Sequence, residues 1–476
     1  MADVCYPATM LRSSNPAGWG VLPPMNAGST NVAGSVTGGG FRRAMDSRSI
    51  YSYGVSSKGN RKVGDLILNG TFDYKEELHE GRCWADVADP YSGNPYIVGG
   101  DVPGSYHRQA FDFSAGLATF RGEHFKFGAS AGYKVGDFSR SNDPRTRSQM
   151  ADYGLEAGLV WNNGPTYRSG SSKLGATLSW YHHKEKMEKP VAKGSPLDAF
   201  KYYDYRGLAD YVPVGLLLFS RRYIANTFAA GVQYWGFYSH SNLYTALHFS
   251  HKGEDVVGNT GETPGDWTED RIDFSSAFAS RFGIFNLEMS LSSGSALRTL
   301  QQQVSELNEE GMAQMYWKTL MSNVYYKALG KSVSLSWQTH DYRPWKARAT
   351  WEGMDRTILL PLSEESTGRL TLRAGKDGLM LGKSLMLGAS VGALMPLGNS
   401  LSLDSSLDST PVIRDNVVLP DYAFMTSRAL TAGSSVKWHF SVGEVPLYLL
   451  FTLDGAFSLD GAGSRLGGTL ILGFRH

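Results

Sequence analysis

The chain has few cysteines, no long hydrophobic run and no excess of charge of either sign. Its 476 residues include two cysteines, Cys5 and Cys83, whose separation matches no metal-binding spacing. We interpret them as unpaired or incidentally paired; a disulfide between them requires the N-terminal segment to reach the loop that holds Cys83. Purely apolar stretches, such as residues 214–219, fall far short of the roughly 18 to 20 residues of a membrane-spanning helix. The sequence therefore excludes a helical membrane protein.

Charge balance argues against nucleic acid as a partner. Lysine and arginine number 46 and aspartate and glutamate 45, which gives a formal net charge of +1. Binding to phosphates needs a concentrated basic surface, so we expect no nucleic-acid partner. No charged and then apolar signal peptide precedes Asp3, and we interpret the sequence as a mature chain with Met1 added or as a processed product.

What the chain does contain favours β-structure. Aromatic residues make up 12%, glycines number 55, and only 19% of residues are charged. Such a mixture is typical of strands, bulges and interfacial aromatic rings. Alternation supports it, because successive side chains of a strand point to opposite faces. Between positions 125 and 135 one face carries Phe125, Phe127, Ala129, Ala131, Tyr133 and Val135, and the other Lys126, Gly128, Ser130, Gly132 and Lys134.

The polar members of these patterns predict a wet interior. The same alternation recurs over residues 152–161, 285–292, 384–395 and 445–459. A soluble sandwich would place hydrophobic residues on its inner faces, whereas here those faces carry Lys, Glu, Asp, Ser and Gly, which favours a water-filled lumen inside lipid. Aromatic residues gather near strand ends, at Tyr133, Trp161, Trp180, Tyr181 and Trp317, where headgroups are expected. Our candidate lumen residues are Lys126, Lys134, Glu156, Asp273, Glu288 and Asp454.

Connections alternate between short and long, the pattern of outer-membrane barrels with short turns in the periplasm. We expect short turns at 121–124, 281–283, 329–331, 341–344 and 443–444, and long loops at 76–105, 188–213, 252–266, 297–311 and 397–419. The alternating segments number about 18, within a range of 16 to 20. The prediction is all-β: one closed antiparallel transmembrane β-barrel over residues 29–476, closed by a last strand at 465–476, after a periplasmic or lumenal segment at 1–28.

Several short motifs resemble an uncharacterised family of outer-membrane β-barrels from Bacteroidota, known as a domain of unknown function. The entry segment Asn15-Pro16-Ala17-Gly18 is similar to that of the family. Asp89-Pro90, Asn94-Pro95-Tyr96 and Asp143-Pro144-Arg145 resemble its loop motifs, and Phe474, third from the end, departs from the usual terminal aromatic. The resemblance implies the barrel fold and the bacterial outer membrane, and it implies no activity.

Candidate chemistry is sparse, and we predict no enzyme, cofactor or metal site. His182 and His183 are adjacent and point to opposite strand faces, and His248 and His251 also diverge. We interpret the histidines as solvated or at headgroup level, with a metal or haem contact at the outer rim as the alternative. Lumenal acids beside Lys126 or Lys134 are typical of a salt-bridged wall. No Ser-His or Asp-His constellation, and no phosphate-binding glycine loop, stands in a convincing context.

Two loops carry features of their own. Residues 198–211 combine aromatic residues with arginine, the composition of a binding surface. The candidate partner residues are Phe200, Tyr202, Tyr203, Tyr205 and Arg206; an inward fold over the lumen is the equal alternative. In residues 297–310, Leu297, Leu300, Val304 and Leu307 have helical spacing and predict a short amphipathic helix.

Two functions remain open. The first is a diffusion pore or transport channel, indicated by small inward residues and a strand count wide enough for water. The second is a non-conducting accessory subunit of an outer-membrane complex, for TonB-dependent iron or haem uptake or for protein export. Its partners would be other outer-membrane or surface lipoprotein subunits besides lipid, and residues 2–27 would act as a plug or a periplasmic contact. A soluble propeller or solenoid ranks below both, since no repeat of fixed period is present.

Overall fold

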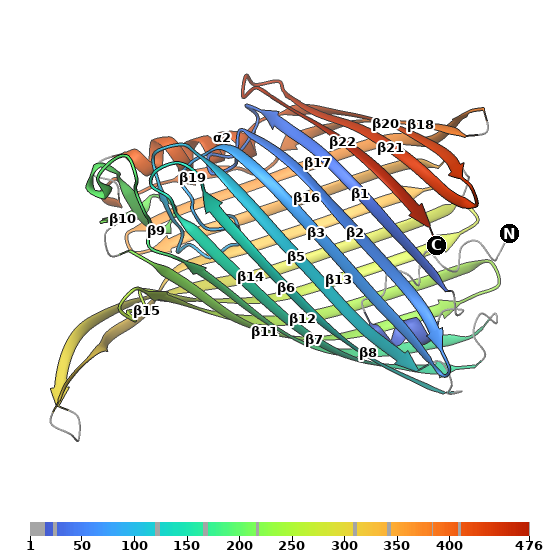
Figure 1. Ribbon diagram of the computed structural model, residues 1–476, viewed down its shortest axis with the longest axis horizontal. Helices are drawn as coiled ribbons and strands as arrows, with labels where there is room; N and C mark the ends of the chain where they lie inside the picture. The colour runs from blue at the N-terminus through green and yellow to red at the C-terminus, as the bar shows by residue number, and fades with distance from the viewer. Residues whose placement is uncertain are drawn as a thin grey trace.

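The described chain forms one closed antiparallel β-barrel of 18 long strands (Figure 1). The computed structural model describes residues 15–21, 26–119, 124–164, 170–215, 219–307, 312–339, 344–382, 384–407 and 411–475. The barrel strands are β1 (Ala27–Gly39), β2 (Ser49–Val63), β3 (Leu66–Arg82), β5 (Gly104–Thr119), β6 (Phe125–Arg140), β7 (Arg147–Asn163), β8 (Ser172–Met187), β11 (Arg221–Phe237), β12 (Ser241–Gly258), β13 (Gly265–Ser280), β14 (Gly283–Leu307), β15 (Ala313–Gln338), β16 (Trp345–Leu359), β17 (Leu362–Leu381), β18 (Leu385–Pro396), β20 (Ala429–Val442), β21 (Val445–Ser458) and β22 (Ser464–Arg475).

Closure joins the two ends of the chain. β1 pairs with β2 on one side and with β22 on the other, where Val32 lies opposite Leu472. Within the barrel wall each of these 18 strands pairs on both sides, so no edge is left there and the backbone groups are satisfied within the sheet. The predicted fold class, strand number and closing strand are confirmed.

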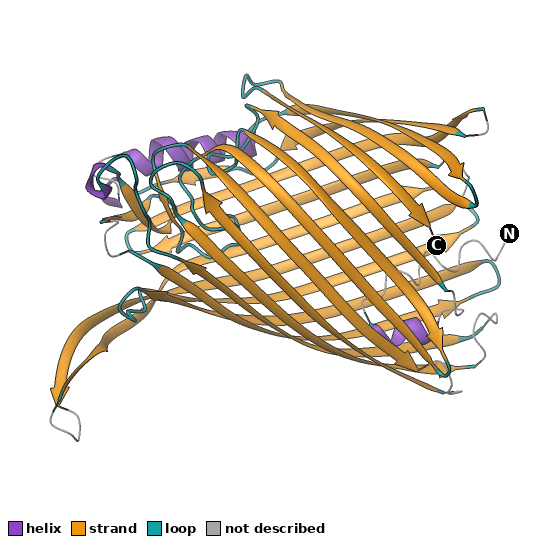
Figure 2. Ribbon diagram, viewed as in Figure 1, coloured by secondary structure: helices purple, strands orange, loops and turns teal. Residues whose placement is uncertain are grey.

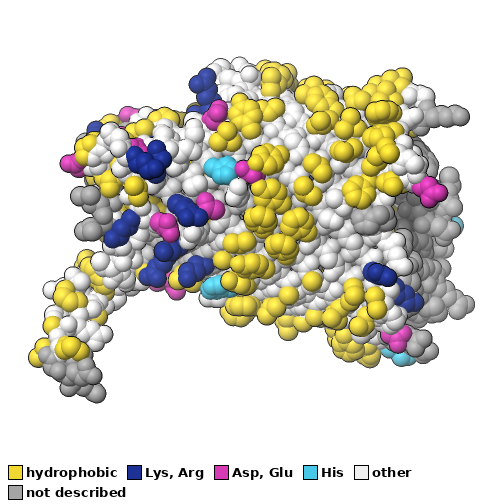
Figure 3. All heavy atoms as spheres, in the orientation of Figure 1, with side chains coloured by type: hydrophobic (Ala, Val, Ile, Leu, Met, Phe, Trp, Pro, Cys, Tyr) yellow, Lys and Arg dark blue, Asp and Glu magenta, His cyan; other side chains and the backbone are white. Residues whose placement is uncertain are grey.

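The two faces of the wall differ as the alternation predicted. On β8, Leu174 and Leu178 point outward and are exposed, whereas Lys173 and Thr177, each directly before one of these leucines, point inward and are buried. Hydrophobic side chains cover the middle of the outer face, and charged side chains gather toward one end (Figure 3). Tyr181 departs from the predicted headgroup position: it points into the lumen, where its hydroxyl donates to Glu156. Among the described residues, no helix is long and apolar enough to cross a membrane.

The start of β1, the end of β22 and most of the short connections lie at one end of the barrel, which we call the turn end; the opposite end is the loop end (Figure 2). The predicted turns at 281–283 and 443–444 lie at the turn end, whereas 329–331 is wrong because these residues lie inside β15. The predicted loop at 252–266 is mostly strand, and the connection between β12 and β13 consists only of residues 259–264. Parts of the predicted turns at 121–124 and 341–344 lie outside the described residues.

The predicted helix over 297–310 is wrong, because the described part of this segment continues β14. Cross-strand pairs with β15, such as Leu300 with Met321 and Val304 with Tyr316, satisfy the backbone instead. Two register shifts interrupt the pairing, where β15 carries the extra residues Tyr325 and Leu320. We call the described parts of residues 299–324 the arm; it projects beyond the barrel at the loop end (Figure 1) and includes Trp317, which was predicted at headgroup level.

Smaller elements lie within the connections. β4 (Val98–Gly100), β9 (Tyr202–Gly207) and β10 (Asp210–Val214) form a three-stranded sheet. The others are η2 (Pro16–Gly20), η3 (Leu197–Ala199), β19 (Ser400–Ser402), η5 (Ser405–Leu407), η6 (Arg414–Val418) and α2 (Leu419–Thr426). β1 begins at Ala27, two residues before the predicted domain boundary.

A charge on the outer face should destabilise the barrel. Leu178 is 68% exposed and lies opposite Ala157, which in turn pairs with Ala129 midway along the apolar band of β6. We expect Leu178→Arg to lower the free energy of unfolding from lipid by about 2–4 kcal/mol, because arginine is costly at the bilayer midplane. Urea titration in vesicles, followed by gel mobility without boiling, measures this loss. Ser179→Arg, next along β8 and facing the lumen beside Glu156, is the matched control; an equal loss there would contradict a lipid-facing surface.

Candidate functional site: the barrel lumen and its outer cap

The six predicted lumen residues all lie on inward faces, and three of the acids form ion pairs. Asp454 lies 2.8 Å from the Arg373 guanidinium, Glu288 3.4 Å from Arg348, and Asp273 2.9 Å from Arg271. These pairs stand on several different strands, so opposite charges face the lumen around much of its wall. Such pairs, half exposed, contribute little to stability and leave the wall strongly polar.

The other three lumen residues lie on one part of the wall. Glu156 accepts a hydrogen bond from the Ser130 hydroxyl at 3.0 Å. Lys134 stands opposite Asp152 and Asp112 in the register of β6, and Lys126 is buried near the turn end. Farther round the wall a cavity of about 670 Å³ opens among Arg271, Asp273, Ser275, Glu288, Ser290 and Ser332.

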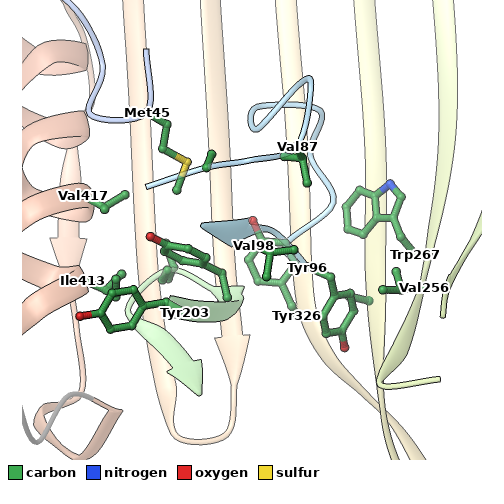
Figure 4. Packing of buried hydrophobic residues seen from close by; sticks show 14 of the residues in the cluster. Met45, Val87, Tyr96, Val98, Tyr203, Val256, Trp267, Tyr326, Ile413 and Val417 are labelled. Atoms are coloured by element: carbon green, nitrogen blue, oxygen red, sulfur yellow. The ribbon is translucent and has the colours of Figure 1, made fainter. Parts of the chain in front are cut away.

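At the loop end, three connections fold into the barrel, and we call the described parts of residues 83–103, 188–220 and 397–428 the outer cap. Its apolar side chains pack against inward residues of the wall in one buried cluster (Figure 4). Val98, Tyr203 and Ile413 come from the three connections, and Val256, Trp267 and Tyr326 come from the wall. The outer part of the lumen is therefore filled like the core of a soluble protein.

The predicted partner loop belongs to this cap. Tyr202, Tyr203 and Tyr205 are 1%, 5% and 3% exposed, so the structure places them in the core of the cap and not on a surface. Phe200, partly buried, packs against the same cluster. Of the two alternatives that the sequence left open, the inward fold matches this arrangement. β9 is buried on both faces, because the adjacent Tyr202, Tyr203 and Asp204 are all buried, so no alternation of apolar and polar residues marks it in the sequence.

Buried polar contacts attach the cap to the wall. The Arg221 guanidinium on β11 lies 2.9 Å from the Asp204 carboxylate on β9, with both side chains almost fully buried. The Tyr223 hydroxyl donates to the carbonyl of Tyr96 at 2.8 Å. The amide of Ala88 donates to Glu185 on β8 at 3.0 Å. Breaking a buried ion pair by removing one partner costs about 3–5 kcal/mol, so these contacts hold the cap firmly.

Asp421 on α2 joins three connections of the loop end. Its carboxylate accepts hydrogen bonds from the amide of Ala44, at 2.6 Å, and from the hydroxyl of Tyr91, at 3.4 Å. The Tyr91 hydroxyl in turn accepts from the amide of Met45 at 3.1 Å. Burial raises the pKa of Asp421 to about 6. The residue that ties α2 to the β1–β2 and β3–β5 connections therefore titrates near neutral pH.

Cavities lie within and beneath the cap. One of about 300 Å³ is lined by charged side chains of the wall, among them Lys134, Asp152 and Glu254, and by cap residues such as Asn94. Another, of about 150 Å³, lies between the cap and β15–β17 beside Tyr326 and Arg356. Asn94 lines both cavities, so the filled lumen retains space on either side of it.

At the turn end a second segment occupies the lumen. Residues 15–21, which contain η2, lie against the inward faces of β5, β6 and β7 (Figure 2). The Asn15 side chain is fully buried there. Sequence reasoning left this segment as either periplasmic or lumenal, and its described part lies in the lumen.

Histidines and cysteines give no assembled site in the described residues. His182 bonds Asn226 at 3.0 Å on the outer face, and His183 lies 2.5 Å from Asp152 on the inner face. No group of three or more His, Cys, Asp or Glu residues in the described ranges is placed to hold a metal ion. Cys83 is buried, which raises its thiol pKa to about 11. Cys5 lies outside the described residues, so its pairing stays an open prediction.

The fold and the lumen define a large transmembrane β-barrel whose interior is polar in the middle and occupied near both ends. The chain belongs to a family of unknown function, DUF6850, whose model matches residues 16–474. The predicted resemblance to a domain of unknown function is confirmed to this extent. No curated protein matches the chain.

The chain is also similar to solved structures of a receptor and a transporter. The ferric preacinetobactin receptor BauA from Acinetobacter baumannii has a TM-score of 0.42 and 9% identity, covering 95% of this chain and 80% of that one. The FrpB iron transporter from Neisseria meningitidis has a TM-score of 0.44 and 9% identity, covering 95% and 82%. Nothing about what this chain carries follows from these likenesses.

The titration of Asp421 should make the attachment of α2 depend on pH. Its pKa is raised from an ordinary 3.8 to about 6, so the protonated form favours the attached cap; this contribution, roughly 3 kcal/mol, is complete below pH 4 and lost as the pH rises through 6. We expect hydrogen-exchange protection of residues 84–97 and 411–427, corrected for intrinsic rates, to fall between pH 4.5 and 7. Asp421→Asn should remove this dependence, and Asp415→Asn, at an exposed position of η6, should preserve it. A flat wild-type profile would contradict the assignment.

Proposed function

We propose that the protein is a transport channel of the bacterial outer membrane, with the turn end in the periplasm, and that the outer cap restricts it to small polar solutes. One observation carries the proposal: an 18-stranded wall with an apolar outer face encloses a lumen lined by paired charges. Barrels of 16 to 18 strands have room for an aqueous channel. The outer-membrane location and a Bacteroidota source rest on the strand pattern and on the family resemblance.

The paired charges indicate the class of solute. Arginines and acids alternate around the wall, as in Arg373 with Asp454 and Arg348 with Glu288. Such a lumen has no strong field of one sign, so it favours neutral or zwitterionic polar solutes over simple ions of one charge. The cavities beneath the cap, of about 150 and 300 Å³, set the scale of what can pass.

Removing part of the cap should enlarge the channel. β8 and β11 are neighbours that pair up to Met187 and Arg221, so a short Asn-Gly turn can replace residues 189–219. We expect this variant to show a several-fold larger conductance step than wild type in planar bilayers, because the β9–β10 hairpin leaves the lumen. Shortening the arm by replacing residues 299–324 with the same turn is the matched control. It should leave the conductance unchanged, since the arm projects away from the barrel; silence of all three proteins would contradict a channel.

A second function, a non-conducting accessory subunit of an outer-membrane complex, is favoured by the arm. Leu300, Met315 and Met321 are each more than half exposed on this two-stranded extension, and an isolated hairpin is only marginally stable in water. Under this alternative the arm binds another outer-membrane or surface lipoprotein subunit, in iron or haem uptake or in protein export.

The accessory function predicts a complex that depends on the arm. Gentle detergent extraction at native expression, followed by mass spectrometry, should recover a stoichiometric partner with wild type and lose it with the arm-shortened variant. The variant without residues 189–219 serves as the control that retains the arm. A monomeric wild-type species would exclude this function.

A further inference from the structure

A row of glycines crosses four neighbouring strands on the inner wall near the turn end. Each would clash with residues 15–21 if it carried a side chain. A Cβ at Gly116 would lie 2.4 Å from the Trp19 ring. At Gly128 it would lie 2.3 Å from the amide nitrogen of Ala17, at Gly158 2.0 Å from the Asn15 amide oxygen, and at Gly175 2.9 Å from the Asn15 amide nitrogen.

The close contacts occur only where the segment crosses the strand, as a second glycine of β6 shows. Gly132 stands on the same strand and the same face as Gly128, two inward positions further along, and a Cβ there would meet only the carbonyl oxygen of Phe113 at 3.7 Å. The segment therefore approaches the backbone of Gly128 too closely for any side chain, whereas Gly132 has room for one. Because the four glycines of the row come from β5, β6, β7 and β8, they form a groove shaped for a chain that lies across the strands.

Neutral hydrogen bonds fix the segment in this groove. The Asn15 amide nitrogen donates to the carbonyls of Leu159 and Ala176, both at 3.2 Å, and to the Gln233 side chain at 3.0 Å. The Asn15 amide oxygen accepts from the amide of Ala17 at 2.9 Å. Ala17 and Val21 then join a small buried cluster with inward wall residues, among them Val160, Trp235 and Tyr244.

The segment has the properties of a removable plug. It contributes no barrel strand, and residues 15–21 contain no charged side chain, so its release exposes no unpaired charge and breaks no ladder of the wall. We propose that residues 15–21 are a plug seated in the glycine groove, which narrows the lumen at the turn end and opens it on withdrawal. This inference rests on the proposed channel function for its effect on conduction, and on the groove alone for the seating.

Gly128→Val tests the seating. A valine suits an extended strand and fills the groove, whereas Gly132→Val adds the same side chain to open space. Intact, purified barrels are exposed to chymotrypsin, and cleavage after Trp19 is read by mass spectrometry. We expect wild type and Gly132→Val to be protected and Gly128→Val to be cut. Asn15→Ala, which leaves the barrel sequence untouched, should lose protection as well and covers the case in which Gly128→Val fails to fold.

Conductance of the same proteins tests the gating. We expect a larger single-channel step for Gly128→Val and Asn15→Ala than for wild type and Gly132→Val. If Trp19 stays protected in both Gly128→Val and Asn15→Ala, the seating in the groove is wrong. If Trp19 is cleaved in these variants but their conductance step is no larger than that of wild type, the segment is not a plug. If every protein is silent while protease still separates the variants, the channel function fails and the plug's gating role with it, but the groove stands.

Discussion

In hydrocarbon, a peptide N–H or C=O without a partner costs several kcal/mol, and this constraint determines how the chain begins and ends. β1 forms ladders with both β2 and β22 over almost its whole length, from Ala27 to Gly39. The first and last strands must therefore meet in register, which fixes the positions of the other strands between them. All other features, including the alternating faces and the occupied lumen, depend on that closed ladder.

Closure at 18 strands creates an interior too wide for wall side chains to fill. The two ends solve this problem with inserted chain, and they do so differently. At the loop end, the cap brings its own small sheet and the helix α2, and it buries tyrosines against Trp267 and Tyr326. At the turn end, residues 15–21 fit into a groove that is lined by glycines. The middle is left polar.

Sequence reasoning succeeded where local pattern and global fold agree, as on β6, where Phe127 and Lys126 alternate between lipid and lumen. It failed where one sequence pattern was compatible with two kinds of secondary structure. Leu300 and Val304 fit a helix, but these residues pair with Met321 and Tyr316 across β15 instead. The buried contact between Arg221 and Asp204, and the role of Asp421, could not be predicted, because each joins segments that the sequence keeps apart. The motif that begins at Asn15 was recognised in the sequence, but its position in the lumen became clear only from the glycines that it contacts.

The two insertions also differ in what holds them. The cap is fastened by a buried ion pair and a large apolar cluster, and removing one partner of such a pair costs about 3–5 kcal/mol. The segment at the turn end is held by neutral hydrogen bonds, each worth about 0.5–1.5 kcal/mol net, and by a smaller apolar cluster. Water in the lumen can replace those bonds when the segment leaves, whereas it cannot replace the packed core of the cap. We therefore expect the free-energy difference between occupied and open states to be smaller at the turn end, which favours opening there.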